Sequence, residues 1–382
     1  MNETLRTLRW SELSVPAMTS KTRGIVKARL RSLLGNETAG TRLEPGLPPG
    51  CTLEMIEEAC KETTGQSVSG TRFKHLSSWK PHGAFLVEAT TSGGNTMTLV
   101  FKRAVATPEF NPVLERLPFT PGPAEYAILQ APGDSLRAFL PRVFFAAELE
   151  PGVEYVMLSE DLDASHRRLH RDDRMRLIDQ ISDLHAALAE QGAVPRTDLL
   201  IDSLANRDDL PDFFEYRLRQ HYQETGDRIV GRLIRQFDAV ANVYRSVDLP
   251  EKAIGIVHGD PNLSNIRVPR QPGGPPKFID WEWAGVHLLH IDLATILKFA
   301  NPVLESKVLR RYAERNAHLS HDMHRRLYYW CKLERSLLDV CLMATLAENP
   351  APRQLNVDIF LQRSSRAALH AYTHLVGNAT NQ

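Results

Sequence analysis

The chain has 382 residues, 42% hydrophobic and 24% charged, a composition typical of soluble globular proteins and a length that exceeds one compact core. Its 46 Lys and Arg side chains are balanced by 46 Asp and Glu side chains, which argues against a partner that is nucleic acid or a membrane surface. No stretch reaches the ~20 apolar residues of a membrane span, and the N-terminus lacks the apolar run of a signal peptide. Four cysteines are too few for a disulfide scaffold, so we expect reduced thiols in a cytoplasmic protein.

Residues 1–50 are polar and mixed, and we interpret them as an N-terminal extension of unknown role. One amphipathic helix is predicted at residues 21–34, and the Gly- and Pro-rich segment LEPGLPPGC is typical of a linker. A short helix is predicted at residues 52–62, with Thr52 as its N-cap, because a Thr hydroxyl can accept a hydrogen bond from the first helical turn. The first folded unit is therefore expected to begin at residue 51.

A strand-rich unit follows this helix. Short apolar runs predict three strands, at residues 73–78, 83–90 and 96–102. The turn TTSGGNT joins the last two as a hairpin. A helix is predicted at residues 122–130 (GPAEYAILQ), and two more strands at residues 142–147 and 154–158. This unit is thus expected to contain a sheet and one substantial helix.

From about residue 170 the pattern becomes helical, because apolar residues recur at spacings of three and four in MRLIDQISDLHAALAEQ. Residues 211–247 predict one or two long helices, and helices are again predicted from Leu288 to near the end. Residues 254–281 interrupt this pattern with two short strands around a loop. The second part of the chain is therefore mainly helical with a small strand-and-loop insert.

The last helical region contains a histidine cluster and an aromatic cluster, and we assign neither of them to a metal or cofactor site. His318, His321 and His324 are spaced by three, and we interpret them as a solvated helix face rather than a metal site. The aromatic run LYYWCKLERSL at residues 327–337 predicts the buried core of a helix.

The segment IGIVHGDPNLSNIRV carries residues suited to phosphoryl transfer, a reaction that needs positioning and charge stabilisation. Asp260 ends an apolar run and could take the proton of an attacking hydroxyl. Asn265 follows five residues later, and Asp280 ends a second short apolar run, so both could offer oxygen atoms to Mg²⁺. Either aspartate alone could cap a turn, but the joint pattern favours the catalytic interpretation.

This pattern resembles the aminoglycoside phosphotransferase and choline kinase-like family, the small-molecule kinases built on the protein-kinase fold. His258, Asp260, Asn265 and Asp280 match the catalytic and metal-binding motifs of that family. The resemblance covers roughly residues 55–345 and is strongest over residues 254–295.

The resemblance implies an α+β, protein-kinase-like bilobal fold, with a small β-rich N-lobe and a larger, mainly helical C-lobe. We place the nucleotide-binding N-lobe at residues 51–158. The C-lobe, with the catalytic loop and the acceptor site, is placed at residues 159–382.

The resemblance also implies roles for residues outside the loop. Lys102 would hold the α- and β-phosphates, and Glu125 on the following helix would hold Lys102. Strand alternation sends the adjacent Arg103 to the opposite face. The adenine edge would bind backbone groups of the hinge, at Ser159, Glu160 and Asp161, although the two acids could instead belong to the substrate side. Structural support of the catalytic loop is expected from His258 and Asp292, and His185 is expected to be a buried structural histidine.

The sequence departs from the protein kinases in three respects. No GxGxxG loop lies between the first two strands, although Ser77 and Ser78 could still contact phosphate. Trp-Glu follows Asp280 in place of Phe-Gly, and no Ala-Pro-Glu segment comes after it. Glu282 could help at a second metal ion or pair with a nearby base. These differences argue against a protein kinase.

The sequence therefore predicts an ATP- or GTP- and Mg²⁺-dependent O-phosphotransferase with Asp260 as the base. Its partner would be a small hydroxylated acceptor, such as an aminoglycoside-like antibiotic, an amino alcohol or a sugar-like metabolite. The protein would be a monomer or a homodimer. The alternative is a non-catalytic kinase-like nucleotide-binding protein, which would be expected to have lost a base or metal residue.

Overall fold

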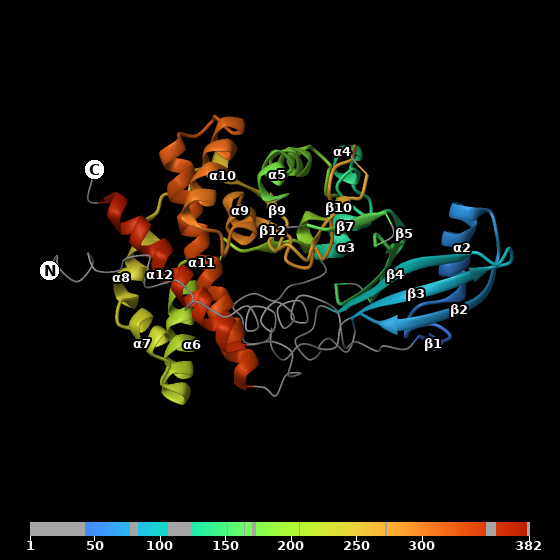
Figure 1. Ribbon diagram of the computed structural model, residues 1–382, viewed down its shortest axis with the longest axis horizontal. Coiled ribbons are helices and arrows are strands. Elements are labelled where there is room, and N and C mark those ends of the chain that lie inside the picture. The colour runs from blue at the N-terminus through green and yellow to red at the C-terminus, as the bar shows by residue number, and fades with distance from the viewer. Residues whose placement is uncertain are drawn as a thin grey trace, which may run out of the picture. The chain divides into compact units, whose positions relative to one another are not determined.

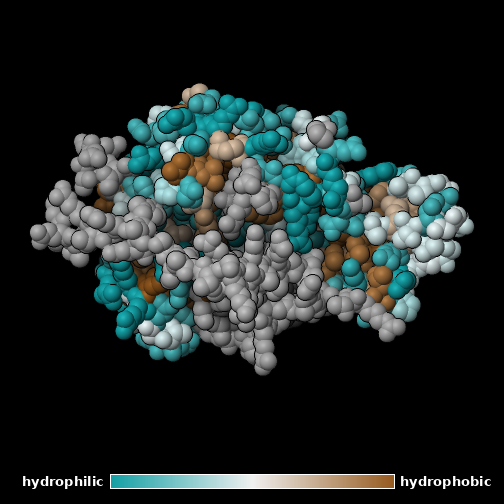
Figure 2. All heavy atoms as spheres, viewed as in Figure 1, coloured by the Kyte–Doolittle hydropathy of each residue, from teal (hydrophilic) through white to brown (hydrophobic). Residues whose placement is uncertain are grey.

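The computed structural model describes residues 43–379 except for the positions 77–82, 106–123, 151, 164, 170–172, 206, 272 and 349–356. The helix predicted at residues 21–34 and the two serines Ser77 and Ser78 lie outside the described residues. Within the described part, no helix is long and apolar enough to cross a bilayer. On the face drawn in Figure 2, hydrophilic side chains predominate and apolar ones form separate patches.

Six antiparallel strands form the sheet of the N-terminal part, in the order β1-β2-β3-β4-β6-β5. Their bounds are Glu44–Pro45 (β1), Val68–His75 (β2), Ala84–Thr91 (β3), Thr96–Val105 (β4), Val143–Glu150 (β5) and Glu154–Glu160 (β6). The predicted hairpin is confirmed, because β3 and β4 pair up to Thr90 opposite Thr96. The short strand β1 lies within the predicted N-terminal extension and pairs with β2.

Helix α2 (Leu53–Thr64) packs against this sheet (Figure 1). It begins after Thr52, whose hydroxyl accepts a hydrogen bond from the Met55 N–H, as its sequence predicts. It ends at Gly65, whose φ of 72° is the left-handed conformation that glycine adopts without strain. The apolar face of α2 and the sheet enclose a small hydrophobic core.

Strand β6 separates this small core from a second, larger one. Val156 and Leu158 face the small core with α2, whereas Tyr155 and Met157 pack into the larger core. This division follows from the two-residue alternation of side chains along a strand. One strand therefore joins the β-rich part to the helical part.

The larger core is built mainly by helices. They are α3 (Ala124–Leu129), α4 (Asp134–Arg137), α5 (Arg174–Ala189), α6 (Leu210–Thr225), α7 (Arg228–Ile234), α8 (Phe237–Ser246), α9 (His290–Ile296), α10 (Pro302–Arg315), α11 (His321–Glu348) and α12 (Val357–Ala379). Figure 1 shows α11 crossing this part, in contact with α12. The aromatic run on α11 is buried, as predicted.

The expectation of one or two helices over residues 211–247 is wrong, because the segment forms three. Gly226, with a φ of 65°, ends α6 in the left-handed conformation. Asp227 then begins α7, and its side chain accepts hydrogen bonds from the backbone N–H groups of Ile229 and Val230. A C-cap glycine and an N-cap aspartate in succession break the apolar periodicity that had suggested longer helices.

Two three-stranded sheets lie among these helices and carry the loop singled out above. One has the order β11-β10-β7, and the other β8-β12-β9. The bounds are His166–Arg168 (β7), Ile201–Asp202 (β8), Ile254–Val257 (β9), Ile266–Pro269 (β10), Lys277–Phe278 (β11) and Gly285–Leu288 (β12). Two one-turn 3₁₀ helices, Thr197–Leu199 and Glu251–Ala253, precede β8 and β9. The expected α+β architecture, with a β-rich N-terminal part and a mainly helical C-terminal part, is thus confirmed.

The interpretation of the three spaced histidines as a solvated helix face is wrong for His324, whereas His318 and His321 are exposed as expected. His318 precedes α11, and His324 is buried against His290 of α9, with 2.8 Å between His290 Nε2 and His324 Nδ1. His324 Nε2 lies 2.8 Å from the Asn316 carbonyl oxygen, so it must be the protonated nitrogen. His324 Nδ1 must then accept the proton of His290 Nε2. Tertiary packing therefore buries His290 and His324 as a neutral pair, which the spacing of the histidines along the sequence does not indicate.

This pair predicts a loss of stability in acid. Burial and neighbouring histidines lower the pKa of His290 well below its usual value, and burial lowers that of His324. The unfolded chain then binds more protons, so stability is full above pH ~6.5 and falls as the pH drops below it. Each such histidine contributes a slope of about 1.4 kcal/mol per pH unit. Urea unfolding of wild type and His290→Gln at pH 7.5 and 5.5 measures this. The free energy of unfolding should fall less between the two pH values in the variant than in wild type, and an equal fall would contradict the prediction.

Candidate active site

Lys102 and two carboxylates meet where the sheet faces the loop segments. Lys102 Nζ lies 2.9 and 2.8 Å from the two carboxylate oxygens of Glu125 on α3. The same nitrogen lies 2.9 Å from Oδ1 of Asp280, which follows β11. The adjacent Arg103 pairs instead with Glu154. The structure therefore brings together Lys102, Glu125 and Asp280, and it directs Arg103 elsewhere.

The charges in this cluster support one another. Burial alone would lower the pKa of Lys102, but the charges of Asp280 and Glu125 raise it overall. Glu282 acts on Lys102 in the same direction. Burial raises the pKa of Glu125, and the charge of Lys102 opposes this. Lys102 is thus held as a cation between carboxylates.

The loop after β9 is held by a buried carboxylate on α9. Asp292 Oδ2 accepts from the His258 N–H at 3.1 Å, and Oδ1 accepts from the Gly259 N–H at 2.9 Å. His185 Nε2 lies 3.0 Å from Asp292 Oδ2. Burial would raise the pKa of Asp292, but its bond to His185 and the nearby imidazoles lower it overall. Asp292 is therefore an ionised acceptor that fixes the start of the loop.

His258 connects the two segments that end in aspartates. Its Nε2 lies 3.1 Å from the Ile279 carbonyl oxygen, and its Nδ1 lies 3.3 Å from the Asp260 backbone nitrogen. These partners require a proton on Nε2 and a lone pair on Nδ1. Burial lowers the pKa of His258, which favours this neutral form. His258 thus acts through the backbone on the spacing of Asp260 and Asp280.

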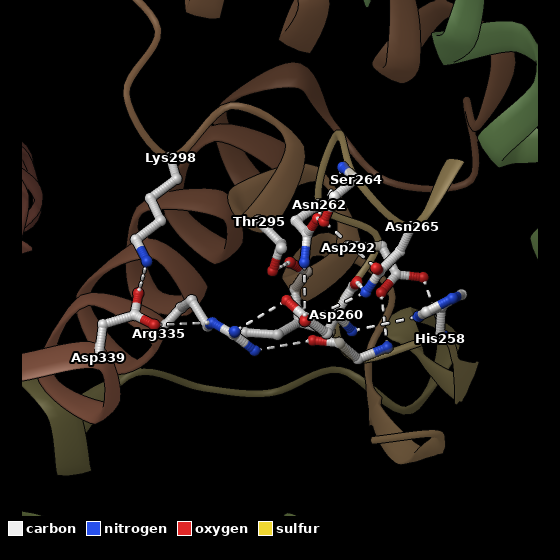
Figure 3. Close-up of polar contacts among 12 residues, drawn as sticks. His258, Asp260, Asn262, Ser264, Asn265, Asp292, Thr295, Lys298, Arg335 and Asp339 are labelled. Carbon is white, nitrogen blue, oxygen red and sulfur yellow. Dashed lines mark hydrogen bonds and ion pairs between the residues drawn. The ribbon is translucent and has the colours of Figure 1, made fainter. Parts of the chain in front are cut away.

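The Asp260 carboxylate is held by hydrogen bonds on both oxygens (Figure 3). Oδ2 accepts from Asn262 Nδ2 at 2.9 Å, and Asn265 Nδ2 lies 3.4 Å away. Oδ1 accepts from Arg335 Nη2 at 2.8 Å. Burial raises the pKa of Asp260, and the charge of Arg335 works against that increase. A partly buried carboxylate with a raised pKa suits a group that must take a proton.

Asn265 and Asp280 offer oxygen atoms on adjoining backbone. The Ile279 N–H donates to the Asn265 carbonyl oxygen at 2.9 Å, and Asn265 Nδ2 donates to the Asp260 carbonyl oxygen at 3.0 Å. Asp280 has a φ of 66°, the only positive φ of a non-glycine residue in the described part of the chain. Such strain is found at sites where a side chain must point in one direction.

The chemistry of these two donors fits a Mg²⁺ ion. Mg²⁺ prefers oxygen ligands and is often bound by one or two protein oxygens together with phosphates and water. The described residues contain no cluster of three or more His, Cys, Asp or Glu side chains that could hold a metal ion. Asn265 and Asp280 are therefore suited to a metal that arrives with a nucleotide.

The predicted hinge residues lie at the end of β6 and are not joined to this cluster by a side-chain contact. Ser159 pairs with Val100 of β4. Glu160 accepts a hydrogen bond from the Arg142 N–H through its side chain, at 2.8 Å. Asp161 accepts from the N–H of Asp163 at 3.1 Å. These residues lie between the sheet and the helical part, as a hinge would. The hinge assignment stays a prediction.

Sequence reasoning missed a basic residue beside Asp260. Arg335 on α11 contacts Asp260 and, through Nε, lies 3.5 Å from Asp339 Oδ1. Asp339 also forms a buried ion pair with Lys298. Arg335 stands within the aromatic run taken as helix core, and no local motif distinguishes it. The available signal was that Lys332, Glu334 and Arg335 carry charge within a helix segment predicted to be buried, because a buried charge needs a partner.

Comparison of the sequence with protein families gives a match over residues 118–330 to the family described as "Phosphotransferase enzyme family". The match spans more than half of the chain and includes Glu125 and the whole loop after β9. No curated protein sequence matches the chain significantly.

Solved structures similar to this one are kinases of small molecules by their descriptions. A choline kinase from Cryptosporidium parvum Iowa II has 10% identity and a TM-score of 0.55, with 86% of this chain and 97% of that chain covered. A microcompartment-associated aminopropanol kinase has 13% identity and a TM-score of 0.53, with coverage of 92% and 98%. A spectinomycin phosphotransferase in complex with ADP and spectinomycin has 12% identity and a TM-score of 0.52, with coverage of 83% and 98%. At these identities the likeness is one of fold.

The close packing of the loop predicts a severe effect of a single methyl group. Gly259 has a φ of 80°, and a Cβ there would lie 2.1 Å from the Trp283 carbonyl oxygen. Gly94 has the same φ but open space around it. Gly94→Ala should cost about 1 kcal/mol from backbone strain alone. Gly259→Ala should cost about 3 kcal/mol or more, because backbone must move. Urea unfolding measures the loss of free energy of unfolding in the two variants. Equal losses would contradict the close approach of Gly259 to the Trp283 carbonyl oxygen.

Proposed function

The chain belongs to the phosphotransferase enzyme family, and from this premise we propose that it transfers the γ-phosphoryl group of ATP or GTP to a hydroxyl of a small molecule. It is a small-molecule kinase, and the open questions are its donor, its metal and its acceptor. The observation that carries the proposal is the pairing of Lys102 with both Glu125 and Asp280, in the same part of the molecule as the Asp260 loop.

The reaction assigned to Asp260 is removal of the acceptor proton. As the acceptor oxygen forms a bond to the γ-phosphorus, the bond between that phosphorus and the bridging oxygen breaks and the nucleoside diphosphate leaves. The hydroxyl proton passes to the Asp260 carboxylate, which must therefore be ionised beforehand. The hydrogen bonds to both Asp260 oxygens support this role, because they hold an ionised carboxylate in one orientation.

The nucleotide is assigned to the cluster around Lys102. Lys102 would bind the α- and β-phosphates, Glu125 would keep it in place, and the backbone near Ser159–Asp161 would bind the base. Asn265 and Asp280 would hold Mg²⁺, which when bound neutralises charge on the phosphate oxygens. Asp280 now contacts Lys102, so nucleotide binding is expected to exchange part of that contact for phosphate oxygens. We assign these functions to residues 51–158 for the nucleotide and residues 159–382 for the loop and acceptor.

The acceptor is proposed to be a hydroxylated small molecule, in line with the choline, aminopropanol and spectinomycin enzymes of similar fold. Two acids of the C-terminal helices, Glu334 and Asp339, are engaged within the protein. Glu334 binds Tyr244 and His287, and Asp339 pairs with Lys298. An ammonium-bearing acceptor would therefore have to find its anionic partners elsewhere among the C-lobe residues.

Nucleotide binding is expected to raise the melting temperature in a Mg²⁺-dependent way. Saturating ATP or GTP at about 100 times its Kd adds about 2.7 kcal/mol, a shift of several degrees. Asp280→Asn should abolish the Mg²⁺-dependent part, because it removes the charge while asparagine still tolerates a positive φ. Asp322→Asn, at an exposed carboxylate in the first turn of α11, is the matched control and should retain the full shift. Thermal-shift titrations with and without Mg²⁺ measure this, and an unchanged shift in Asp280→Asn would remove that residue from the metal site.

Loss of the proposed base is expected to stop transfer without stopping nucleotide binding. Asp260→Asn should lower kcat by about 10²–10⁴-fold, the range contributed by a positioned general base. Its nucleotide-induced melting shift should stay close to that of wild type. Steady-state assays with ATP and a panel of hydroxylated acceptors measure the first quantity. Turnover by Asp260→Asn at the wild-type rate would exclude Asp260 as the base, and nucleotide binding without turnover in wild type would favour a non-catalytic protein.

A further inference from the structure

Arg335 contacts the loop after β9 at two consecutive residues. Its Nη1 donates to the Gly259 carbonyl oxygen at 3.0 Å, and its Nη2 donates to Asp260 Oδ1 at 2.8 Å. Figure 3 shows the guanidinium of Arg335 between Asp260 and Asp339. One planar group thus binds both the backbone just before Asp260 and the Asp260 carboxylate, which fixes their relative orientation.

The two peptide groups of Gly259 are bound by two different helices. Asp292 of α9 accepts from its N–H, and Arg335 of α11 donates to its C=O. The backbone between these contacts has no room for a Cβ, since Trp283 lies against it. The position of Asp260 is therefore determined from both sides, by an anion on α9 and a cation on α11.

Arg335 is itself held by a chain of alternating charges. Asp339, one helical turn further along α11, lies 3.5 Å from Arg335 Nε and forms an ion pair with Lys298, just after α9. The side chains of Arg335 and Asp260 are only 12% and 17% exposed. A buried ion pair adds little stability compared with apolar residues of similar size. A purely structural purpose is therefore a poor account of charges placed directly against Asp260.

We propose that Arg335 is a positioning residue of the phosphoryl transfer, an inference that rests on the function proposed above. Arg335 donates a hydrogen bond to Asp260 Oδ1, and Asn262 donates one to Oδ2. The carboxylate cannot rotate without breaking both bonds, so a remaining lone pair faces the acceptor hydroxyl in a fixed direction. Arg335 acts through Asp260 and does not contact the nucleotide. Its loss should impair the chemical step and leave nucleotide binding intact.

Steady-state kinetics of Arg335→Gln and Arg335→Lys test this role, with Mg²⁺-ATP as donor and water as the acceptor common to all variants. Arg335→Gln should lower kcat by about 10–100-fold, with the KM for ATP unchanged within about twofold. Arg335→Lys should recover part of the loss, because an ammonium can make one of the two contacts. Arg326→Gln, a half-buried arginine on the same helix, is the matched control and should keep the wild-type kcat. Equal effects on kcat and KM, or no recovery by lysine, would overturn the proposal.

A thermal double-mutant cycle tests the same contact without requiring activity. Arg335→Gln leaves the buried Asp260 carboxylate without its cation, so its melting temperature should fall markedly. In the Asp260→Asn background the same substitution should lower the melting temperature by less than half as much. Additive changes in melting temperature would show that the two side chains do not interact, and would overturn the proposal. Absence of nucleotide binding in wild type would instead overturn the proposed function, while the cycle would still report on the Arg335–Asp260 pair.

Discussion

The buried carboxylate of Asp292 determines where the loop after β9, which carries Asp260, lies. It accepts two consecutive backbone N–H groups, those of His258 and Gly259, and it binds His185 from α5. Its place in the first turn of α9 is favourable, because the helix dipole stabilises negative charge there. An ionised group with no exposure to water must have such partners. The end of β9, the start of α9 and the position of Asp260 are thereby set together.

A second set of charges joins the β-rich part to the helical part. Lys102 on β4 binds Glu125 on α3 and Asp280 after β11, and the last pair is 178 residues apart in the chain. α3 packs into the larger core, so Glu125 is fixed by helices while Lys102 is fixed by the sheet. Lys102 and the two carboxylates neutralise one another, since each of these charged side chains would be costly to bury alone. The groups proposed to bind the nucleotide therefore come together only when both parts of the fold are formed.

Charges around Asp260 alternate in sign across α9 and α11. Asp260, Arg335, Asp339 and Lys298 follow one another with contacts at each step. Such an arrangement has no large net charge, which keeps the desolvation cost below that of isolated ions. It also limits the orientations open to Arg335 and Asp339, because each of these two side chains has an oppositely charged partner on either side. Orientation, rather than stability, is what this arrangement offers a reaction that depends on precise placement.

The sequence by itself determined the features whose causes are local. The Thr52 cap of α2, the hairpin between β3 and β4, and the pattern of Asp260, Asn265 and Asp280 each depend on residues close in the chain. The fold class followed from the resemblance that this pattern carries. Spacing and turn chemistry are properties of a short segment, so they can be read without knowing what packs against it.

Only the tertiary structure decided which distant side chains meet. Arg335 reaches Asp260 across 75 residues, and His324 is buried by His290 rather than solvated. Helical periodicity indicates which face of α11 is buried, but it does not identify the partner on the opposing element. A buried charge is stable only beside a particular counter-charge, and that partner is supplied by the way α9, α11 and the loop pack together.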